Sequence, residues 1–130
     1  MDYPCIKGIG IDMVYIPTIR KYIEQNSAFL RRTFTSKEQK ASADRADPAQ
    51  YYAARFAVKE AVFKAVAHLT ENKTFDFRIV ETLNTDDEAP YVTTDGALAP
   101  ILQQAGITQL HISITTEGDY AAAFVVACGT

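Results

Sequence analysis

The distribution of apolar residues predicts a strand followed directly by a helix at the start of the chain. Residues 6–14 (IKGIGIDMV) are apolar, β-branched and interrupted by glycine, which is typical of a buried strand. Pro17 then suits the first turn of a helix, and apolar residues recur at helical spacing up to about residue 25.

A capping box and a proline mark the start of two further helices. Thr35 and Glu38 fit the pattern in which a hydroxyl and a carboxylate satisfy the free amides of a first helical turn. Asp47 and Pro48 open residues 48–69, which are rich in alanine and contain no internal glycine or proline. We expect this stretch to be the central helix of the fold.

The remaining pattern predicts strands and one more helix. Residues 75–83 and 90–94 are expected to be strands, and residues 95–104 to be a helix closed by Gly106. Residues 108–127 predict two strands around a tight turn. Helices and strands are segregated along the chain, so the predicted class is α+β, with an antiparallel sheet and a long central helix.

Size and composition narrow the picture further. A chain of 130 residues, 48% hydrophobic, predicts a single domain over residues 1–130. The first residues lack the pattern of a secretory signal, and no apolar run approaches the roughly 20 residues of a membrane helix, so we expect a cytoplasmic protein without a membrane partner. Cys5 and Cys128 form no CxxC pair, and we expect them to pack as free thiols, with a disulfide possible only if the terminal strands are neighbours.

The net charge of −3 hides an uneven distribution. Residues 17–45 contain seven basic and three acidic residues, whereas residues 71–119 contain nine acidic and two basic residues. The acidic body argues against a nucleic-acid partner. The basic segment is either a solvated helix face or a docking surface for an acidic protein or a polyphosphate.

Three charged residues are candidates for chemistry. Asp12 lies in an apolar strand, where a carboxylate is either a cap or a metal ligand. Glu60 and Lys64 lie one turn apart on the long helix, where an ordinary ion pair would contribute only about 0.3–0.5 kcal/mol. Together the three groups could hold magnesium and a polyphosphate, because magnesium prefers one or two carboxylates with phosphate oxygens and water.

The glycines at positions 8 and 10 admit two interpretations. Gly8 and Gly10 could begin a dinucleotide-binding fingerprint, but Met13 stands where its third glycine would be. They otherwise serve a bulge or a close contact between backbones.

Four sequence blocks together resemble the holo-acyl-carrier-protein synthases, a family of small 4'-phosphopantetheinyl transferases. The resemblance spans nearly the whole chain in order and spacing. The blocks are GIGID (8–12), RTFT (32–35) with Glu38, RFAVKEA (55–61) with Lys64 and Ala65, and HISIT (111–115) leading to YAAA (120–123).

The resemblance implies a magnesium-dependent transfer of phosphopantetheine from coenzyme A to a serine of an apo acyl carrier protein, with release of 3',5'-ADP. It implies that Asp12 and Glu60 hold the metal and that these two residues and Lys64 form the catalytic group. It assigns coenzyme A contacts to Arg55, Lys59, Lys64 and Thr116. It also implies a homotrimer with sites between subunits, and an acidic carrier that suits the basic segment.

This sequence departs from the family pattern at several positions. Tyr15 replaces a usual glutamate, Thr18 replaces an arginine, and Thr116 replaces the histidine of the closing strand motif. His111 cannot substitute, because five residues along a strand place it on the opposite face. Two alternatives therefore remain: a diverged relative that binds coenzyme A or a carrier protein without transfer, and a thioester-handling hotdog-type domain.

Overall fold

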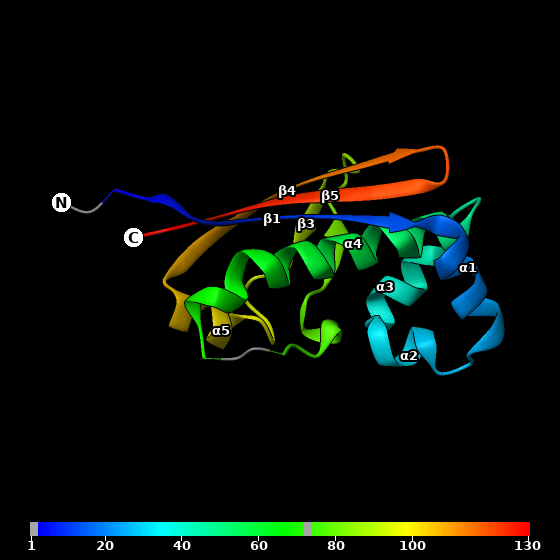
Figure 1. The fold of residues 1–130 in the computed structure, drawn as a ribbon, viewed down its shortest axis with the longest axis horizontal. Coiled ribbons are helices and arrows are strands. Elements are labelled where there is room, and N and C mark those ends of the chain that lie inside the picture. The colour runs from blue at the N-terminus through cyan, green and yellow to red at the C-terminus, as the bar shows by residue number, and fades with distance from the viewer. Residues whose placement is uncertain (1–2, 72–73) are drawn as a thin grey trace.

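Three long strands form one layer of the molecule, and the helices cover one face of that layer (Figure 1). The computed structural model describes residues 3–71 and 74–130. Strands β1 (Cys5–Tyr15), β4 (Ile107–Glu117) and β5 (Tyr120–Gly129) pair antiparallel in the order β1-β5-β4. A smaller antiparallel pair joins β2 (Thr82–Asn84) to β3 (Pro90–Val92). The predicted α+β class with an antiparallel sheet is confirmed.

The helices begin and end largely where local sequence signals place them. They are α1 (Ile16–Gln25), α2 (Phe29–Thr33), α3 (Ser36–Ala41), α4 (Pro48–Val66) and α5 (Ala99–Ala105), with single 3₁₀ turns at Ser42–Asp44, Ala67–Leu69 and Phe77–Ile79. The capping box of α3 is present: the Glu38 amide donates to Thr35 Oγ1 over 3.2 Å, and the Thr35 amide donates to Glu38 Oε1 over 2.9 Å. Gly106 ends α5 at φ 74°, a left-handed conformation that favours glycine.

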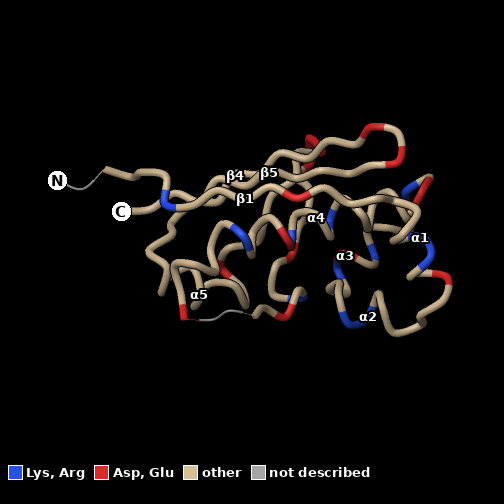
Figure 2. Tube along the Cα trace, viewed as in Figure 1, with Lys and Arg blue, Asp and Glu red and all other residues tan. Residues whose placement is uncertain are grey.

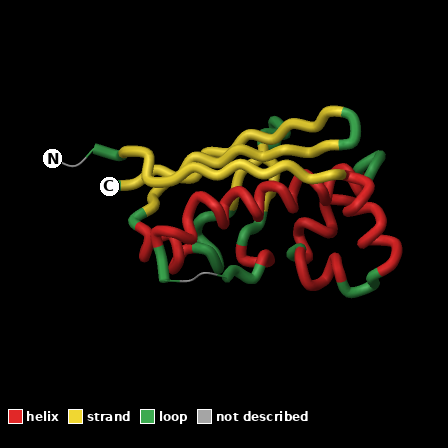
Figure 3. Tube along the Cα trace, viewed as in Figure 1, coloured by secondary structure: helices red, strands yellow, loops and turns green. Residues whose placement is uncertain are grey.

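Helix α4 is the centre of the fold and lies against β1 and β5 (Figure 3). Its alanines at four-residue spacing, Ala53, Ala57, Ala61 and Ala65, are all 0% exposed. A Cβ atom added to Gly8 or Gly10 would overlap the carbonyl oxygens of Ala65 and Ala61. The two glycines therefore permit close packing of a strand on a helix, which is the second of the two interpretations above.

The prediction of a strand over residues 75–83 is wrong for most of its length. Only Thr82–Asn84 is a strand, and Phe77–Ile79 is a 3₁₀ turn. The Arg78 amide donates to Asp76 Oδ1. The Lys59 ammonium donates to the Phe77 and Val80 carbonyls. These two carbonyls therefore accept hydrogen bonds from a lysine side chain and not from a neighbouring strand.

Two helix predictions also need correction. Helix α5 begins at Ala99, not at residue 95, and the short α2 was not predicted. Helix α2 has five residues and no side-chain cap at its start, so it leaves little local signal.

The terminal strands are neighbours, but their cysteines do not pair. Cys5 lies opposite Gly129 and Cys128 lies opposite Ile6, so the two side chains are one position out of register and both thiols are free. Among the described residues, no helix has the length and apolar content needed to span a membrane.

The outer face of the three-stranded sheet carries no helix (Figure 3). Its side chains are apolar along β1 and β5 and polar along β4, where His111, Ser113 and Thr115 lie. Ile9, Ile11 and Met13 on β1 are between 60% and 65% exposed, and Phe124 on β5 lies opposite Ile11 and is 43% exposed. The solvated face of an antiparallel sheet is ordinarily polar. We call this surface the outer face. On β1 and β5 it exposes large apolar side chains of the kind that are usually buried.

Candidate active site

Asp12, Glu60 and Lys64 come together at the edge of the sheet formed by β1. Gly8, Gly10, Asp12 and Val14 alternate along β1 and point toward α4, which places the Asp12 carboxylate beside that helix. Lys64 Nζ donates to Asp12 Oδ1 and to the Ile11 carbonyl, each over 3.0 Å. Lys64 therefore pairs with Asp12 across elements, not with Glu60 along the helix.

The interpretation of Asp12 as a helix cap is wrong. The N-cap of α1 is Tyr15, which makes no side-chain cap hydrogen bond. The Asp12 side chain is 17% exposed and its partner Lys64 is 50% exposed, so the pair lies at the surface where a ligand can reach it.

Glu60 shares this site and is electrostatically coupled to Asp12. Partial burial raises the pKa of the Glu60 carboxyl, the negative charge of Asp12 raises it further, and Lys64 opposes the shift. A carboxyl whose pKa is raised by burial and by a neighbouring carboxylate lies where a bound cation would be stabilised.

A second polar group faces the other side of α4. Arg55 precedes Glu60 by five residues, so the two side chains leave the helix about 140° apart around its axis. The Arg55 guanidinium hydrogen-bonds Asn84 and stacks 4.4 Å from the centre of the Tyr51 ring, while Arg45 lies 5.4 Å from the same ring. Two guanidinium groups thus flank one aromatic ring.

Arg45 lines two adjoining hollows, and Arg55 lines one of them. Among the described residues, the Nε atoms of Arg45 and Arg55 are buried and have no hydrogen-bond partner. One hollow of about 640 Å³ is lined by Arg45, Tyr51 and Asn84 among others. The other, of about 230 Å³, is lined by Arg45, Arg55 and Thr116 among others. The larger hollow is also lined by Asp44, Asp86 and Glu88, so the smaller hollow, which has two arginines and one acid, Asp47, suits an anion better.

Thr116 joins the second group and lies away from Asp12. It is exposed on β4, opposite Ala121 of β5, which in turn lies opposite Val14 of β1. Strand β5 therefore separates the two groups, and β4 lies about 10 Å from β1. Asp12, Glu60 and Lys64 thus form one cluster at the β1 edge, and Arg55 on α4 forms a second cluster with Thr116 on β4.

Lys59 has surroundings different from those expected of a coenzyme A contact. Its side chain is 0% exposed and its ammonium is 2.8 Å from Glu38 Oε1, an acid that is also 0% exposed. Burial lowers the pKa of the Lys59 ammonium, and the charge of Glu38 opposes that shift. With its donors directed at Glu38 and two carbonyls, this lysine does not face either ligand surface.

The histidines and the basic segment take separate positions. His111 is exposed on the outer face, opposite Val126, and not on the face that carries Thr116, as the strand alternation predicted. His68 is exposed after the end of α4. The basic residues gather on α1, α2 and α3 at one end of the molecule (Figure 2), where Arg31 and Arg32 are exposed and Arg20 forms two hydrogen bonds with Asp47.

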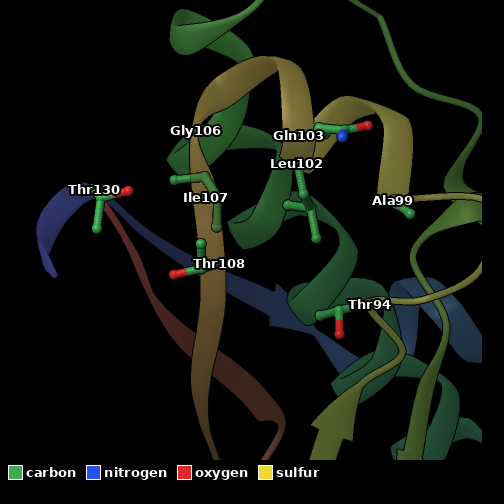
Figure 4. A pocket seen from close by; sticks show the side chains of 8 residues that line it. All are labelled: Thr94, Ala99, Leu102, Gln103, Gly106, Ile107, Thr108 and Thr130. Carbon is green, nitrogen blue, oxygen red and sulfur yellow. The ribbon is translucent and has the colours of Figure 1, made fainter.

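A further hollow lies at the other end of the molecule, beside α5 and the start of β4 (Figure 4). Its volume is about 440 Å³ and its lining side chains are uncharged: Thr94, Ala99, Leu102, Gln103, Ile107, Thr108 and Thr130, with Gly106 between them. We assign it no chemistry.

Comparison with known proteins places the fold in a family. The family model of the 4'-phosphopantetheinyl transferase superfamily matches residues 8–125. The chain is 38% identical over 125 residues to a holo-[acyl-carrier-protein] synthase of Desulforudis audaxviator, covering 95% of this chain and 94% of that protein.

Solved structures agree. The crystal structure of holo-[acyl-carrier-protein] synthase from Neisseria meningitidis superposes with a TM-score of 0.82 at 32% identity, covering 95% of this chain and 98% of that one. The Helicobacter pylori synthase in complex with coenzyme A superposes with a TM-score of 0.76 at 28% identity, covering 92% and 98% of the two chains. The chain therefore belongs to the 4'-phosphopantetheinyl transferase superfamily, as an enzyme of the holo-[acyl-carrier-protein] synthase family.

Arg45, Tyr51 and Asn84 were not singled out from the sequence as site residues. Arg45 counted only toward the charge of the basic segment, and Asn84 directly follows the strand predicted over residues 75–83. The spacing of Tyr51 and Arg55, one helical turn apart, was the available signal for a stacked guanidinium.

Proposed function

We propose that this enzyme transfers the 4'-phosphopantetheine arm of coenzyme A to a serine of an apo acyl carrier protein, with magnesium, and releases 3',5'-ADP. The observation that carries the proposal is the meeting of Asp12, Glu60 and Lys64 from two distant segments at one accessible edge. Related enzymes carry the name holo-[acyl-carrier-protein] synthase, and one is solved with coenzyme A. We place the activity in the cytoplasm, as the sequence predicted.

Asp12 and Glu60 fit a magnesium ion by the chemistry of their donors. The raised pKa of Glu60 reflects burial and the charge of Asp12, and a divalent cation between the two would relieve both costs. When bound, magnesium would polarise the phosphate oxygens and neutralise charge that develops on them.

Lys64 would hold the phosphates. In the structure it balances the charge of Asp12, and with the metal on Asp12 the ammonium can turn to a phosphate oxygen. In the transfer, the serine Oγ bonds to the β-phosphorus, the bond from that phosphorus to the bridging oxygen of 3',5'-ADP breaks, and the serine proton is released. Phosphoryl transfer needs mostly positioning and charge stabilisation, so few side chains suffice.

The second cluster would bind the remaining anionic part of coenzyme A. Arg45 and Arg55 line one hollow together with Thr116, and their positive charges would attract an anion. Because β5 separates this cluster from Asp12, we propose that a complete site combines the β1 edge of one subunit with the β4 edge of its neighbour in a homotrimer. A head-to-tail contact of this kind closes into a ring, and the apolar outer face supplies a surface to bury.

The basic helices would dock the carrier protein. Arg31 and Arg32 are exposed in the last turn of α2, and Lys37 and Lys40 are exposed on α3. An exposed basic surface on an acidic body attracts an acidic partner and orients it.

A transfer assay tests the proposal. The enzyme is incubated with magnesium, coenzyme A and an apo carrier protein, and mass spectrometry follows the arm on the carrier serine. We expect transfer by the wild type, none with a chelator, and none by Asp12→Ala or Glu60→Ala, each of which removes a proposed metal ligand. If the wild type bound coenzyme A but transferred nothing at any magnesium concentration, a non-catalytic binder would become the better proposal. The replacement of the motif histidine by Thr116 is the observation that favours that alternative.

A further inference from the structure

A buried ion pair joins three segments that lie around the proposed site. Lys59 Nζ donates to Glu38 Oε1 over 2.8 Å and to the Phe77 carbonyl over 2.9 Å, and it also contacts the Val80 carbonyl. Glu38 Oε1 accepts from the Thr35 amide over 2.9 Å, and Oε2 accepts from the Thr82 amide over 3.1 Å. Both side chains are 0% exposed.

Each of these segments bears a part of the proposed machinery. Glu38 lies on α3, which together with α2 carries the exposed basic residues. Lys59 directly precedes Glu60 on α4. Thr82 opens β2, whose last residue, Asn84, binds Arg55.

Helices α2 and α3 need such a connection, because they have five and six residues and helices this short do not persist alone. Their further contacts converge on the same place. Tyr51 Oη donates to the Glu38 carbonyl over 2.8 Å, and the Lys59 ammonium lies 5.3 Å from the centre of the Phe34 ring, which follows α2.

The stability of the fold does not by itself explain why these two buried residues are charged. Replacing a buried ion pair by apolar side chains of similar volume is often neutral or stabilising. Charged groups make the arrangement specific, because the ammonium can hydrogen-bond Glu38 and the two carbonyls only when the three segments lie in one arrangement.

We propose that Lys59 and Glu38 are positioning residues that hold the basic helices α2 and α3 at a fixed place relative to the Glu60 carboxylate, so that a docked carrier delivers its serine to the phosphates. The inference rests on the proposed function and gives Lys59 a role other than coenzyme A contact. Lys59→Met keeps the length of the side chain and removes the charge.

The test compares Lys59→Met with Leu102→Ala, a core truncation on α5 at 4% exposure, remote from α3. Hydrogen exchange is measured over residues 29–42, and steady-state kinetics are measured with each substrate varied in turn. We expect Lys59→Met to speed exchange selectively in these residues and to lower kcat/KM for the carrier by about 10- to 100-fold, as a displacement near 1 Å would. The KM for coenzyme A should stay within about twofold, and Leu102→Ala should change neither quantity selectively.

Several outcomes would overturn the inference. If both variants lost activity only in proportion to their lost stability, the pair would be merely structural. An equal rise in both KM values would show that it acts through Arg55 and Asn84 instead of the dock. Should Lys59→Met fail to fold, Glu38→Gln keeps the side-chain size and an acceptor for Thr35, and the same criteria apply. A wild type without transfer would contradict the proposed function, whereas unchanged exchange over residues 29–42 would contradict the connection itself.

Discussion

At the scale of single residues, Glu60 should make the stability of the metal-free enzyme depend on pH. Its pKa is raised above the ordinary value near 4.5 by burial and by Asp12. At pH values between the pKa of Glu60 in the unfolded chain and its pKa in the folded protein, Glu60 binds a proton more often in the folded protein. The free energy of unfolding therefore falls as the pH rises through this range. Glutamine mimics the protonated acid, so we expect Glu60→Gln to match the wild type at low pH and to be more stable at pH values above the window.

Urea unfolding from acid to neutral pH in the presence of a chelator measures this difference. Adding magnesium should raise the stability of the wild type and leave Glu60→Gln nearly unchanged. A glutamine variant less stable than the wild type at neutral pH would contradict the raised pKa.

Thr116 stands where the family resemblance implies a histidine. A hydroxyl can hydrogen-bond a phosphate or a water but cannot act as a base near neutral pH, whereas an imidazole can. Because Thr116 is exposed beside Arg55, a histidine fits there. We expect Thr116→His to raise kcat by up to about 100-fold with little change in the KM for coenzyme A.

The pH profile of kcat separates the explanations. The variant should gain an inflection near about pH 6.5, the ordinary imidazole pKa, which the wild type lacks. An unchanged kcat in an already fast enzyme would show that proton transfer never depended on this position.

The predicted site residues differ in how far the sequence could place them. Asp12 could be selected as a candidate because a carboxylate is unfavourable in an apolar strand unless its charge has a partner. Lys64 could be selected because it follows Glu60 by one helical turn. Lys59 has the same sequence surroundings as a ligand-binding lysine, and only tertiary contacts with Glu38 and the Phe77 carbonyl show that it points inward. Arg45 was indistinguishable from other basic residues until Tyr51 packed beside it.

At the scale of elements, the contact of β1 with α4 sets the distance between Asp12 and Glu60. A methyl group at Gly10 would overlap the Ala61 carbonyl, which belongs to helix backbone and cannot rotate away. We expect Gly10→Ala to lower the free energy of unfolding by about 1–3 kcal/mol and to reduce transfer by displacing Asp12. Chemical denaturation measures the change.

Gly96→Ala is the matched control for that substitution. A Cβ there would meet only the Thr93 methyl group at 3.7 Å, an ordinary contact. Equal losses in the two variants would mean that the cost comes from losing a glycine and not from the strand–helix contact.

The elements that the sequence predicted well are those fixed by local signals. Helix α3 follows its capping box, α5 ends at Gly106, and β1 follows its apolar run. The predicted strand over residues 75–83 failed because its carbonyls bind Lys59, a contact from 18 residues away or more that no local pattern contains. Tertiary contacts override propensity in such short segments.

The α2 helix should determine affinity for the carrier. We expect Arg31→Glu with Arg32→Glu to raise the KM for the carrier about tenfold or more and to leave the KM for coenzyme A nearly unchanged. The wild-type KM for the carrier should rise with salt, because exposed charges are screened over about 10 Å at 0.1 M ionic strength. Arg78→Glu, an exposed reversal paired with Asp76 outside the basic helices, is the control and should have little effect. Equal effects on both substrates would point away from a dock on α2.

At the scale of the whole molecule, the two clusters of candidate site residues lie apart within one chain. Asp12 and Glu60 lie at the β1 edge, Arg55 and Thr116 lie toward the β4 edge, and β5 lies between them. The outer face, with Ile9, Ile11 and Met13 more than half exposed, is a large apolar surface for an isolated chain. Both features have one explanation if neighbouring subunits meet around this face.

Mixing two inactive variants tests whether each site is shared between subunits. Asp12→Ala removes a proposed group of the β1 cluster and Arg55→Ala removes one of the β4 cluster, so we expect each variant alone to be inactive. If each site takes one half from each of two neighbours, random mixing in equal amounts should restore about a quarter of the wild-type sites, because that fraction of interfaces joins two intact halves. The variants are unfolded together, refolded and assayed, with separately refolded variants as controls. Recovery should disappear when Met13→Glu is added to both chains, because a charge on the outer face opposes assembly. Folded but inactive mixtures that still form trimers would show that the sites are not shared between subunits.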